Sequence, residues 1–318
     1  MKLRTEIEFV KKEFQFDYSS KIALLGSCFS DEIGGRLKGL KFNTSVNPFG
    51  TLFNPLSIAK LLTDDAVLSE NCFVERDGLF FHHSFHSSFY AASKAELKQK
   101  CDSVIQETKT FLADADLLII TLGTAFIYER KENGGQVANC HKVPQSKFTK
   151  RLCKVDEVVN SIVAIQNKFP HIKIMCTVSP VRHTKDTLEL NAVSKSILRL
   201  ACYELGSCGV EYFPSFEIMN DDLRDYRFFK SDLIHPSDLA VDYIWDKFFK
   251  AFTTIETQEI AHKIQKIVIQ LNHRVQATQS EAHKNLLKKT LAQMEELVSV
   301  VDFENEISTL KIALKSFS

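Results

Sequence analysis

Residues 21–39 read KIALLGSCFSDEIGGRLKG, and this stretch decides the fold. It begins with an apolar run, Lys21–Leu25, that is typical of a buried strand. A short segment, GSCFS at 26–30, follows and leads into a helix-like stretch that extends to residue 39. A strand, a tight connection and a helix in this order predict the first βα unit of an α/β domain.

The same alternation of strand and helix continues along the chain. Further strand-like apolar runs are 116–122 (DLLIITL), 172–178 (IKIMCTV), 210–213 (VEYF) and, more weakly, 42–46. Helix-like stretches cover about 30–39, 55–63, 92–113, 154–168, 186–206 and 237–252. The strands do not alternate apolar and polar residues, as expected where helices cover both faces of a sheet. We therefore expect an α/β fold with a mainly parallel sheet that binds ligands at the carboxyl ends of its strands.

One segment departs from this alternation early in the chain. Residues 72–90 are rich in aromatic side chains on both sides of Asp77-Gly78. An Asp-Gly pair is typical of the turn in a two-residue β-hairpin. We expect an inserted hairpin here, lying over the domain.

A second departure comes at the end of the chain. Residues 237–318 contain neither Gly nor Pro, and apolar side chains recur at helical spacing after residue 259. We expect residues 1–252 to form the main domain and residues 253–318 a helical extension. This extension would consist of two helices that pack on the domain or on a partner.

Composition excludes several classes of protein. The chain has 318 residues with 40 basic and 40 acidic side chains, so it lacks the basic excess of a general nucleic-acid-binding protein. No apolar run approaches the ~18 residues of a membrane span, and the N-terminus lacks the apolar core of a signal peptide. The eight cysteines include no CxxC pair. We expect a cytoplasmic protein with reduced thiols, no membrane contact, no metal and no cofactor.

Cys28 is the first candidate for chemistry. It stands between a strand and a helix, where a side chain is exposed at the strand end. The positive end of the helix dipole stabilises an anion, so this position favours a nucleophilic thiolate. The alternative is a turn of small residues with a buried thiol. The neighbouring hydroxyl of Ser27 is a second candidate nucleophile.

Asp232 and His235 form the second candidate. They are three residues apart in the segment SDLIHP, just before an expected helix. An imidazole serves as a general base, and a nearby carboxylate orients it and stabilises its cation. The alternative is a loop aspartate beside a packed histidine. Together with Cys28, these residues would form a Cys/His/Asp set.

Taken in order along the chain, these motifs resemble the GSCFA family, a branch of the SGNH/GDSL hydrolase superfamily. The resemblance spans roughly residues 20–250. It rests on GSCFS at 26–30, NPFGTLFNP at 47–55, TLGTAFIY at 121–128, NCHKVP at 139–144, SPVRH at 179–183, FPSFEIMNDDLRDYRFF at 213–229 and DLIHP at 232–236.

The resemblance implies a three-layer α/β/α sandwich similar to flavodoxin. It places Cys28 where SGNH hydrolases carry their catalytic Ser, and Ser27 where they carry the preceding Asp. The family's final DxxH pattern corresponds to Asp232 and His235, so that Cys28 would attack, His235 would move the proton and Asp232 would orient His235. Gly50 corresponds to the glycine whose backbone amide donates to the oxyanion.

The sequence departs from the superfamily in its third block, which normally reads Gly-x-Asn-Asp. Here Gly123-Thr124-Ala125 places Ala where the oxyanion-binding Asn would stand. Loss of one such donor typically lowers the rate by about 10²–10³. On the resemblance and on loop position, the candidates that could replace it are Thr124, Asn139, His141 and Asn47.

The remaining histidines are weaker candidates. His82 and His86 would share one face of a strand and His83 the other, and no carboxylate or Cys ligand pattern accompanies them, which argues against a metal. One or two of these three histidines are expected to line the mouth of the ligand-binding pocket at the carboxyl ends of the strands. His183 follows a strand end, where it either lines the pocket or is structural.

The resemblance implies an acyl-ester hydrolase or acyltransferase, with a small-molecule acyl ester or glycan such as an acylated carbohydrate as substrate. The changes at Cys28 and Ala125 support a second hypothesis, a module that binds such a ligand without turnover. A third hypothesis gives the function to the helical extension, as a surface for a partner or for a homo-oligomer.

Overall fold

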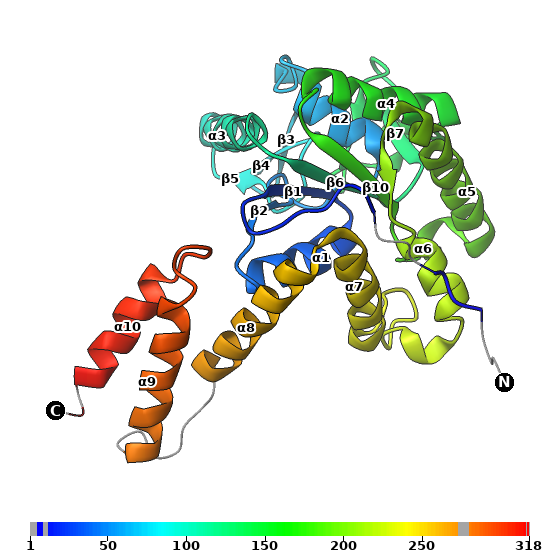
Figure 1. Cartoon of the computed structure of the whole chain (residues 1–318). Coiled ribbons are helices and arrows are strands. Elements are labelled where there is room, and N and C mark those ends of the chain that lie inside the picture. Colours follow the sequence, from blue (N-terminus) through cyan, green and yellow to red (C-terminus); the bar gives the residue numbers. More distant parts are fainter. Residues whose placement is uncertain (1–4, 9–11, 273–279, 316, 318) are drawn as a thin grey trace. The chain divides into compact units, whose positions relative to one another are not determined.

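The computed structural model describes residues 5–8, 12–272, 280–315 and 317 (Figure 1). These residues form two compact units, each assembled from separate stretches of the chain. The first unit is drawn from Met1–Phe9, Lys21–Gly34 and Thr44–Phe248, and the second from Val10–Ser20, Gly35–Asn43 and Phe249–Ser318. The division expected between residues 252 and 253 stays a prediction.

The first unit is built on a five-stranded sheet. Its strands, in the order β11-β10-β6-β1-β2, are β11 (Glu211–Tyr212), β10 (Lys173–Val178), β6 (Leu117–Leu122), β1 (Lys21–Gly26) and β2 (Asn43–Val46). β1 runs parallel to β6, β6 to β10, and β10 to β11. Numbered within this sheet, the strand order is that of flavodoxin-like doubly wound folds. The expected α/β class with a mainly parallel sheet is confirmed.

Helices cover both faces of this sheet (Figure 1). α2 (Pro55–Thr63), α4 (Val155–Lys168) and α5 (Leu188–Leu205) lie on one face, and the parts of α1 (Cys28–Gly39) and α7 (Asp238–Phe252) that belong to this unit lie on the other. The remaining helices of the unit are α3 (Lys94–Leu112) and the short α6 (Ser215–Glu217). Because neither face of the sheet meets water, β6 is buried at every position, which explains why its sequence does not alternate.

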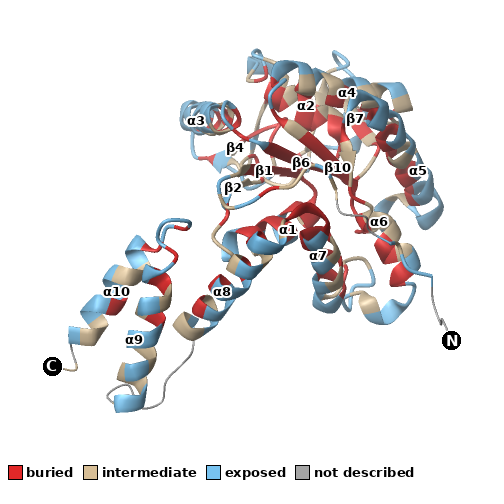
Figure 2. Cartoon of the chain, in the orientation of Figure 1, coloured by how far each residue is buried: buried red, intermediate tan, exposed pale blue. Residues whose placement is uncertain are grey.

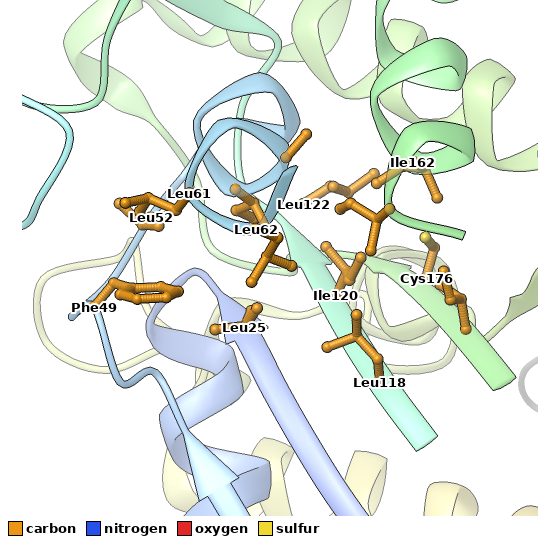
Figure 3. Close-up of a cluster of buried hydrophobic side chains, with 14 of the residues drawn as sticks. Leu25, Phe49, Leu52, Leu61, Leu62, Leu118, Ile120, Leu122, Ile162 and Cys176 are labelled. Atoms are coloured by element: carbon orange, nitrogen blue, oxygen red, sulfur yellow. The ribbon is translucent and has the colours of Figure 1, made fainter. Parts of the chain in front are cut away.

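The core of the first unit lies between the sheet and the helices on the α2 side (Figures 2 and 3). Leu61 and Leu62 of α2 meet Leu25, Leu118 and Ile120 from β1 and β6 there. Each is at most 1% exposed, and full burial of such a side chain contributes about 1.5–3 kcal/mol. Apolar packing around β1 and β6 therefore holds the strand ends in place.

Two small antiparallel sheets complete the first unit. One contains β3 (Phe73–Arg76), β4 (Leu79–His82) and β5 (Tyr90–Ala91), and the other contains β7 (Phe126–Arg130), β8 (Gln136–Val137) and β9 (Phe148–Leu152). Asp77 and Gly78 connect β3 to β4 with φ angles of 54° and 75°. Positive φ at both central residues matches the turn that joins tightly paired strands.

The second unit contains α8 (Ile255–Asn272), α9 (Glu281–Glu295) and α10 (Glu304–Lys315). The expectation of two helices after residue 252 is therefore wrong for the described residues. The break between α9 and α10 needs no Gly or Pro, because the Asp302 carboxylate accepts the N–H of Glu304 at 2.8 Å and starts α10. Residues Ile264, Ile267, Met294, Leu297, Val301, Phe303 and Leu310 form the core of these helices.

Earlier parts of the chain complete the second unit. The Tyr18 and Phe42 rings stack with centroids 4.2 Å apart, and Phe16 meets Phe42 edge-on at 5.6 Å. Lys41 forms an ion pair with Glu306 of α10. The C-terminal helices are thus held by residues 12–20 and 35–43 within one compact unit. No helix in the described ranges is long and apolar enough to cross a membrane.

Gly26 provides a test of how closely β1 and β6 approach. Its φ is +134°, and a Cβ at this position would lie 2.2 Å from the carbonyl oxygen of Thr121. We predict that Gly26→Ala lowers the free energy of unfolding by at least about 2 kcal/mol in urea denaturation. Gly35→Ala is the control, because nothing lies within 4 Å of its added Cβ. Equal stability of Gly26→Ala and wild type would contradict this account.

Candidate active site

The carboxyl ends of β1, β6 and β10 lie at one edge of the sheet. After β1 the chain passes to the face covered by α1, whereas the helices that follow β6 and β10 lie on the opposite face (Figure 1). In an open parallel sheet, such a change of side leaves a crevice outside the strand ends, where ligands bind. The segments that border this edge are Ser27-Cys28, Gly123-Thr124 and Ser179–His183.

Cys28, rather than Ser27, is the accessible nucleophile candidate. Ser27 is completely buried, and its N–H donates to the carbonyl of Thr121 at 3.1 Å. Cys28 is half-buried and is the first residue of α1. Within the described part of the chain, the N–H of Cys28 has no acceptor on another residue. The Cys28 backbone N–H acts on the sulfur of the same residue and lowers its pKa.

The environment of Cys28 favours the thiol. Burial raises the pKa of Cys28, the nearby Asp31 and Glu32 carboxylates raise it further, and Lys195 acts in the opposite direction. The expectation that the helix N-terminus favours a thiolate is therefore corrected. Desolvation and two acidic side chains in the first turns of α1 outweigh the helix dipole.

Asn47 joins the end of β1 to α1. Its φ is +42°, its side-chain oxygen accepts the N–H of Gly26 at 2.9 Å, and its side-chain nitrogen donates to Asp31 Oδ1 at 2.8 Å. Burial raises the pKa of Asp31, and the bond from Asn47 partly offsets this effect. Asn47 is thus a structural link whose amide is largely engaged.

The backbone amides predicted near the oxyanion are already used. The N–H of Gly50 donates to the carbonyl of Asn47 at 2.8 Å, and those of Gly123 and Thr124 both donate to Phe53 at 2.8 Å. The role expected for the Gly50 amide does not fit this geometry. Glycine is required at position 50 for another reason, because its φ is +73° and an added Cβ would lie 2.4 Å from His86 Cβ.

The third-block residues are likewise engaged. Ala125 is completely buried, and its N–H donates to Ser194 Oγ at 2.8 Å. Thr124 Oγ1 lies 3.1 Å from the same Ser194 oxygen. Ala125, at the position where the resemblance led us to look for an oxyanion-binding Asn, therefore packs between the end of β6 and α5.

Asp232 and His235 are hydrogen-bonded to each other. His235 Nδ1 lies 2.7 Å from Asp232 Oδ2, while Asp232 Oδ1 accepts the N–H groups of Ile234 and His235 at 2.9 and 3.0 Å. These bonds hold the pKa of Asp232 well below its usual value. An ionised Asp232 accepts the Nδ1 proton and leaves His235 Nε2 free to accept a proton.

The loop that carries this pair is tied to both sides of the site. Lys230 Nζ lies 3.4 Å from Glu32 Oε1, one turn beyond Cys28 on α1. On the other side, the N–H of Arg182 donates to the carbonyl of Ile234 at 3.2 Å. The Arg182 guanidinium also lies over the Phe229 ring, 3.9 Å from its centroid. The two candidate motifs are therefore brought to the same edge of the sheet.

A lysine and a histidine lie near these motifs. Lys195 of α5 is 1% exposed and donates to the carbonyls of Gly123 and Ser179 at 2.7 and 2.8 Å. His183 is half-buried with its ring edge-on to Phe53, and desolvation, Lys195 and His235 lower its pKa to about 4. Lys195 interacts electrostatically with Cys28, and His183 with His235, so charges couple across the whole edge.

Two family profiles together match most of the residues of this chain. The profile described as the GSCFA family matches residues 21–248, and that described as the GSCFA domain protein, C-terminal domain, matches residues 264–316. The chain belongs to the GSCFA family. A comparison with curated proteins gives no match. The solved structure titled "Crystal structure of a carbohydrate esterase family 3 from Talaromyces cellulolyticus" matches with 11% identity over 76% of this chain and 99% of that chain, at a TM-score of 0.36.

Sequence patterns did not single out Lys195 of this GSCFA protein. The available signal was its place on α5, where it shares a buried stripe at helical spacing with Asn191, Leu198 and Cys202. A lysine on the inward face of an amphipathic helix is unusual, because lysine is almost never fully buried unless it is paired.

His141 and Asn139 of the GSCFA segment NCHKVP join the hairpin. His141 Nε2 bonds to the carbonyl of His82 at 2.9 Å, and its ring stacks on Phe81 at 5.0 Å. The Asn139 carbonyl lies 2.8 Å from His83 Nδ1. The structure therefore places His82 and His83 of the hairpin in a buried cluster with His141, whereas His86 contacts Gly50.

This cluster predicts acid sensitivity. Burial lowers the pKa of His141 from 6.5 to about 4, so the unfolded chain binds the proton first as the pH falls. The free energy of unfolding should therefore fall as the pH drops from about 6.5 to 4. In His141→Phe, which keeps an aromatic ring on Phe81, this pH-dependent loss should be smaller by about 2–3 kcal/mol. Urea denaturation at several pH values measures the free energy of unfolding, with exposed His262→Gln as the control. An unchanged pH dependence in His141→Phe would refute the assignment.

Proposed function

We propose that this GSCFA protein is an acyl-ester hydrolase or acyltransferase whose nucleophile is Cys28 and whose base is His235. One observation carries the proposal: the loop with the Asp232–His235 pair is tied to α1 through Lys230 and Glu32, 3.4 Å apart, just beyond Cys28. This tie supports a site in which a nucleophile, a base and the carboxylate that orients it act together at one edge of the sheet. The choice of an ester, and of an acylated carbohydrate or similar small molecule as substrate, rests on the resemblance to SGNH hydrolases.

The mechanism follows from the protonation states. Because the pKa of Cys28 is raised, a base must take the thiol proton as sulfur attacks the ester carbonyl carbon. His235 Nε2 accepts this proton, and Asp232 stabilises the imidazolium that forms. The N–H of Cys28 turns from its own sulfur to donate to the oxyanion. When the C–O bond breaks, His235 returns the proton to the leaving alcohol and the acyl group stays on Cys28 as a thioester.

A second nucleophile completes the cycle. Water, or the hydroxyl of an acceptor molecule, loses its proton to His235 and attacks the thioester carbonyl. The C–S bond then breaks, and the proton returns to the Cys28 sulfur. Water as nucleophile gives hydrolysis, and an acceptor hydroxyl gives acyl transfer.

Intact-protein mass spectrometry after brief exposure to p-nitrophenyl acetate tests this proposal. We expect a transient acetyl adduct in wild type and in Ser27→Ala, and none in Cys28→Ala. His235→Ala should form the adduct about 10²–10⁴-fold more slowly, because it lacks the general base. Cys208→Ala is the matched control, since Cys208 is an exposed thiol outside the site. Adduct formation at the wild-type rate in Cys28→Ala would overturn the proposal.

A ligand-binding module without turnover is the alternative, and one observation favours it. The N–H groups of Gly50, Gly123 and Thr124 are all engaged by backbone carbonyls, which leaves few donors for an oxyanion. This alternative predicts that Cys28→Ala leaves the affinity for an acylated sugar unchanged in calorimetry, and that no protein forms an adduct. Accumulation of a thioester on Cys28 would exclude it.

A further inference from the structure

Lys195 is a buried cation without a carboxylate partner. It is 1% exposed, and within the described residues no Asp or Glu oxygen lies within ion-pair distance of its Nζ. Its two hydrogen bonds go to the carbonyls of Gly123 and Ser179, directly after β6 and β10. Burying an ammonium group is costly unless it is paired, so a lysine at this place calls for an explanation.

The contacts of Lys195 place it at the candidate site. Its carbonyl partners belong to two of the segments that border the crevice. The ionisable group that acts on Lys195 is Cys28, and Lys195 in turn is the cation that acts on Cys28. The Phe216 ring lies on another side, with its centroid 5.9 Å from Nζ. A negative charge that forms on Cys28 would supply the counter-ion that Lys195 lacks.

We propose that Lys195 is a positioning residue for Cys28. Its buried ammonium stabilises the thiolate that forms when the thiol proton leaves. Its two hydrogen bonds hold the ends of β6 and β10 beside the ammonium group. The role rests on the function proposed for Cys28. The proton passes from Cys28 to His235, and the thiolate that forms makes an internal ion pair with the protonated form of Lys195.

The other charges around Cys28 fit this role. Asp31 and Glu32 on α1 oppose the thiolate, but Asn47 hydrogen-bonds Asp31 and Lys230 pairs with Glu32. Around Lys195 itself, His183 is kept neutral by burial, with its pKa lowered to about 4. Burial also lowers the pKa of Lys195 to about 7, and the charge of Cys28 acts in the opposite direction, so the thiolate and the ammonium stabilise each other.

The test measures the ionisation of Cys28 without any ester substrate. The rate of Cys28 alkylation by iodoacetamide is followed from pH 6 to 10 by peptide mass spectrometry in wild type and Lys195→Met. We expect the apparent pKa of Cys28 to rise by one pH unit or more in Lys195→Met, with alkylation about tenfold slower at pH 7.5. The exposed Cys208 in the same samples should react equally in both proteins. An unchanged Cys28 profile in folded Lys195→Met overturns the proposal.

Lys185→Met is the matched control, because the charge of Lys185 acts on Cys140 instead. It should leave Cys28 unchanged and slow the alkylation of Cys140. Equal slowing of Cys28 by Lys185→Met and Lys195→Met would mean that any nearby positive charge suffices, and it would overturn the specific role of Lys195.

A reciprocal measurement covers the case in which Lys195→Met does not fold, since that variant leaves two carbonyls without donors. The Cε resonance of Lys195 is titrated by NMR in [¹³Cε]lysine-labelled wild type and Cys28→Ala. Linkage requires that removal of Cys28 lowers the titration midpoint of Lys195. Identical midpoints overturn the proposal. Two results together would refute the esterase function but not the Lys195–Cys28 coupling. They are the absence of an acetyl adduct on Cys28 and a raised apparent pKa of Cys28 in Lys195→Met.

Discussion

The parallel pairing of β1 with β6 is the interaction on which the other parts of the site depend. Its register, from Ile22 opposite Leu117 to Gly26 opposite Thr121, brings both strands to an end at the same level. Ser30 Oγ then bonds to Thr121 Oγ1 at 2.7 Å and to the carbonyl of Leu25 at 3.1 Å, which fixes the first turn of α1 below both strand ends. Cys28 occupies its place because this pairing is tight.

The reactivity of Cys28 is a balance of opposing charges. Burial and the carboxylates of Asp31 and Glu32 keep the thiol protonated, whereas Lys195 favours the thiolate. Each carboxylate has its own partner, Asn47 for Asp31 and Lys230 for Glu32. In the mechanism that we propose, the resting thiol ionises as a base removes its proton. The hydrogen bond from His235 to the ionised Asp232 agrees with that role for His235.

The hairpin contributes to the site through the segment after β2. The N–H of His86 donates to the carbonyl of Phe49 at 3.3 Å, and the Phe85 ring meets Phe49 edge-on at 5.9 Å. These contacts hold residues 47–50 in place, and Asn47 in turn holds Gly26 and Asp31. The hairpin thus acts on the site by packing and by a backbone hydrogen bond, while His82 and His83 are buried away from it.

The sequence by itself determined the fold class, because hydrophobic runs and helical periodicity are local properties of the chain. Such local patterns were enough to recognise the strands that begin after residues 20, 116 and 172, the Asp77-Gly78 turn and the family motifs. The pairing of Asp232 with His235 was also foreseen, since it depends on a local turn. The break between α9 and α10 was missed, because it depends on the single capping side chain of Asp302.

Only the tertiary structure decided which predicted groups are free to act. The N–H groups of Gly123 and Thr124 are used by the carbonyl of Phe53 in another loop, and no sequence spacing shows this. The raised pKa of Cys28 likewise results from burial between elements. Lys195 is more than 160 residues from Cys28 in the chain. It meets the site only because α5 packs on the sheet and reaches the carbonyls after β6 and β10.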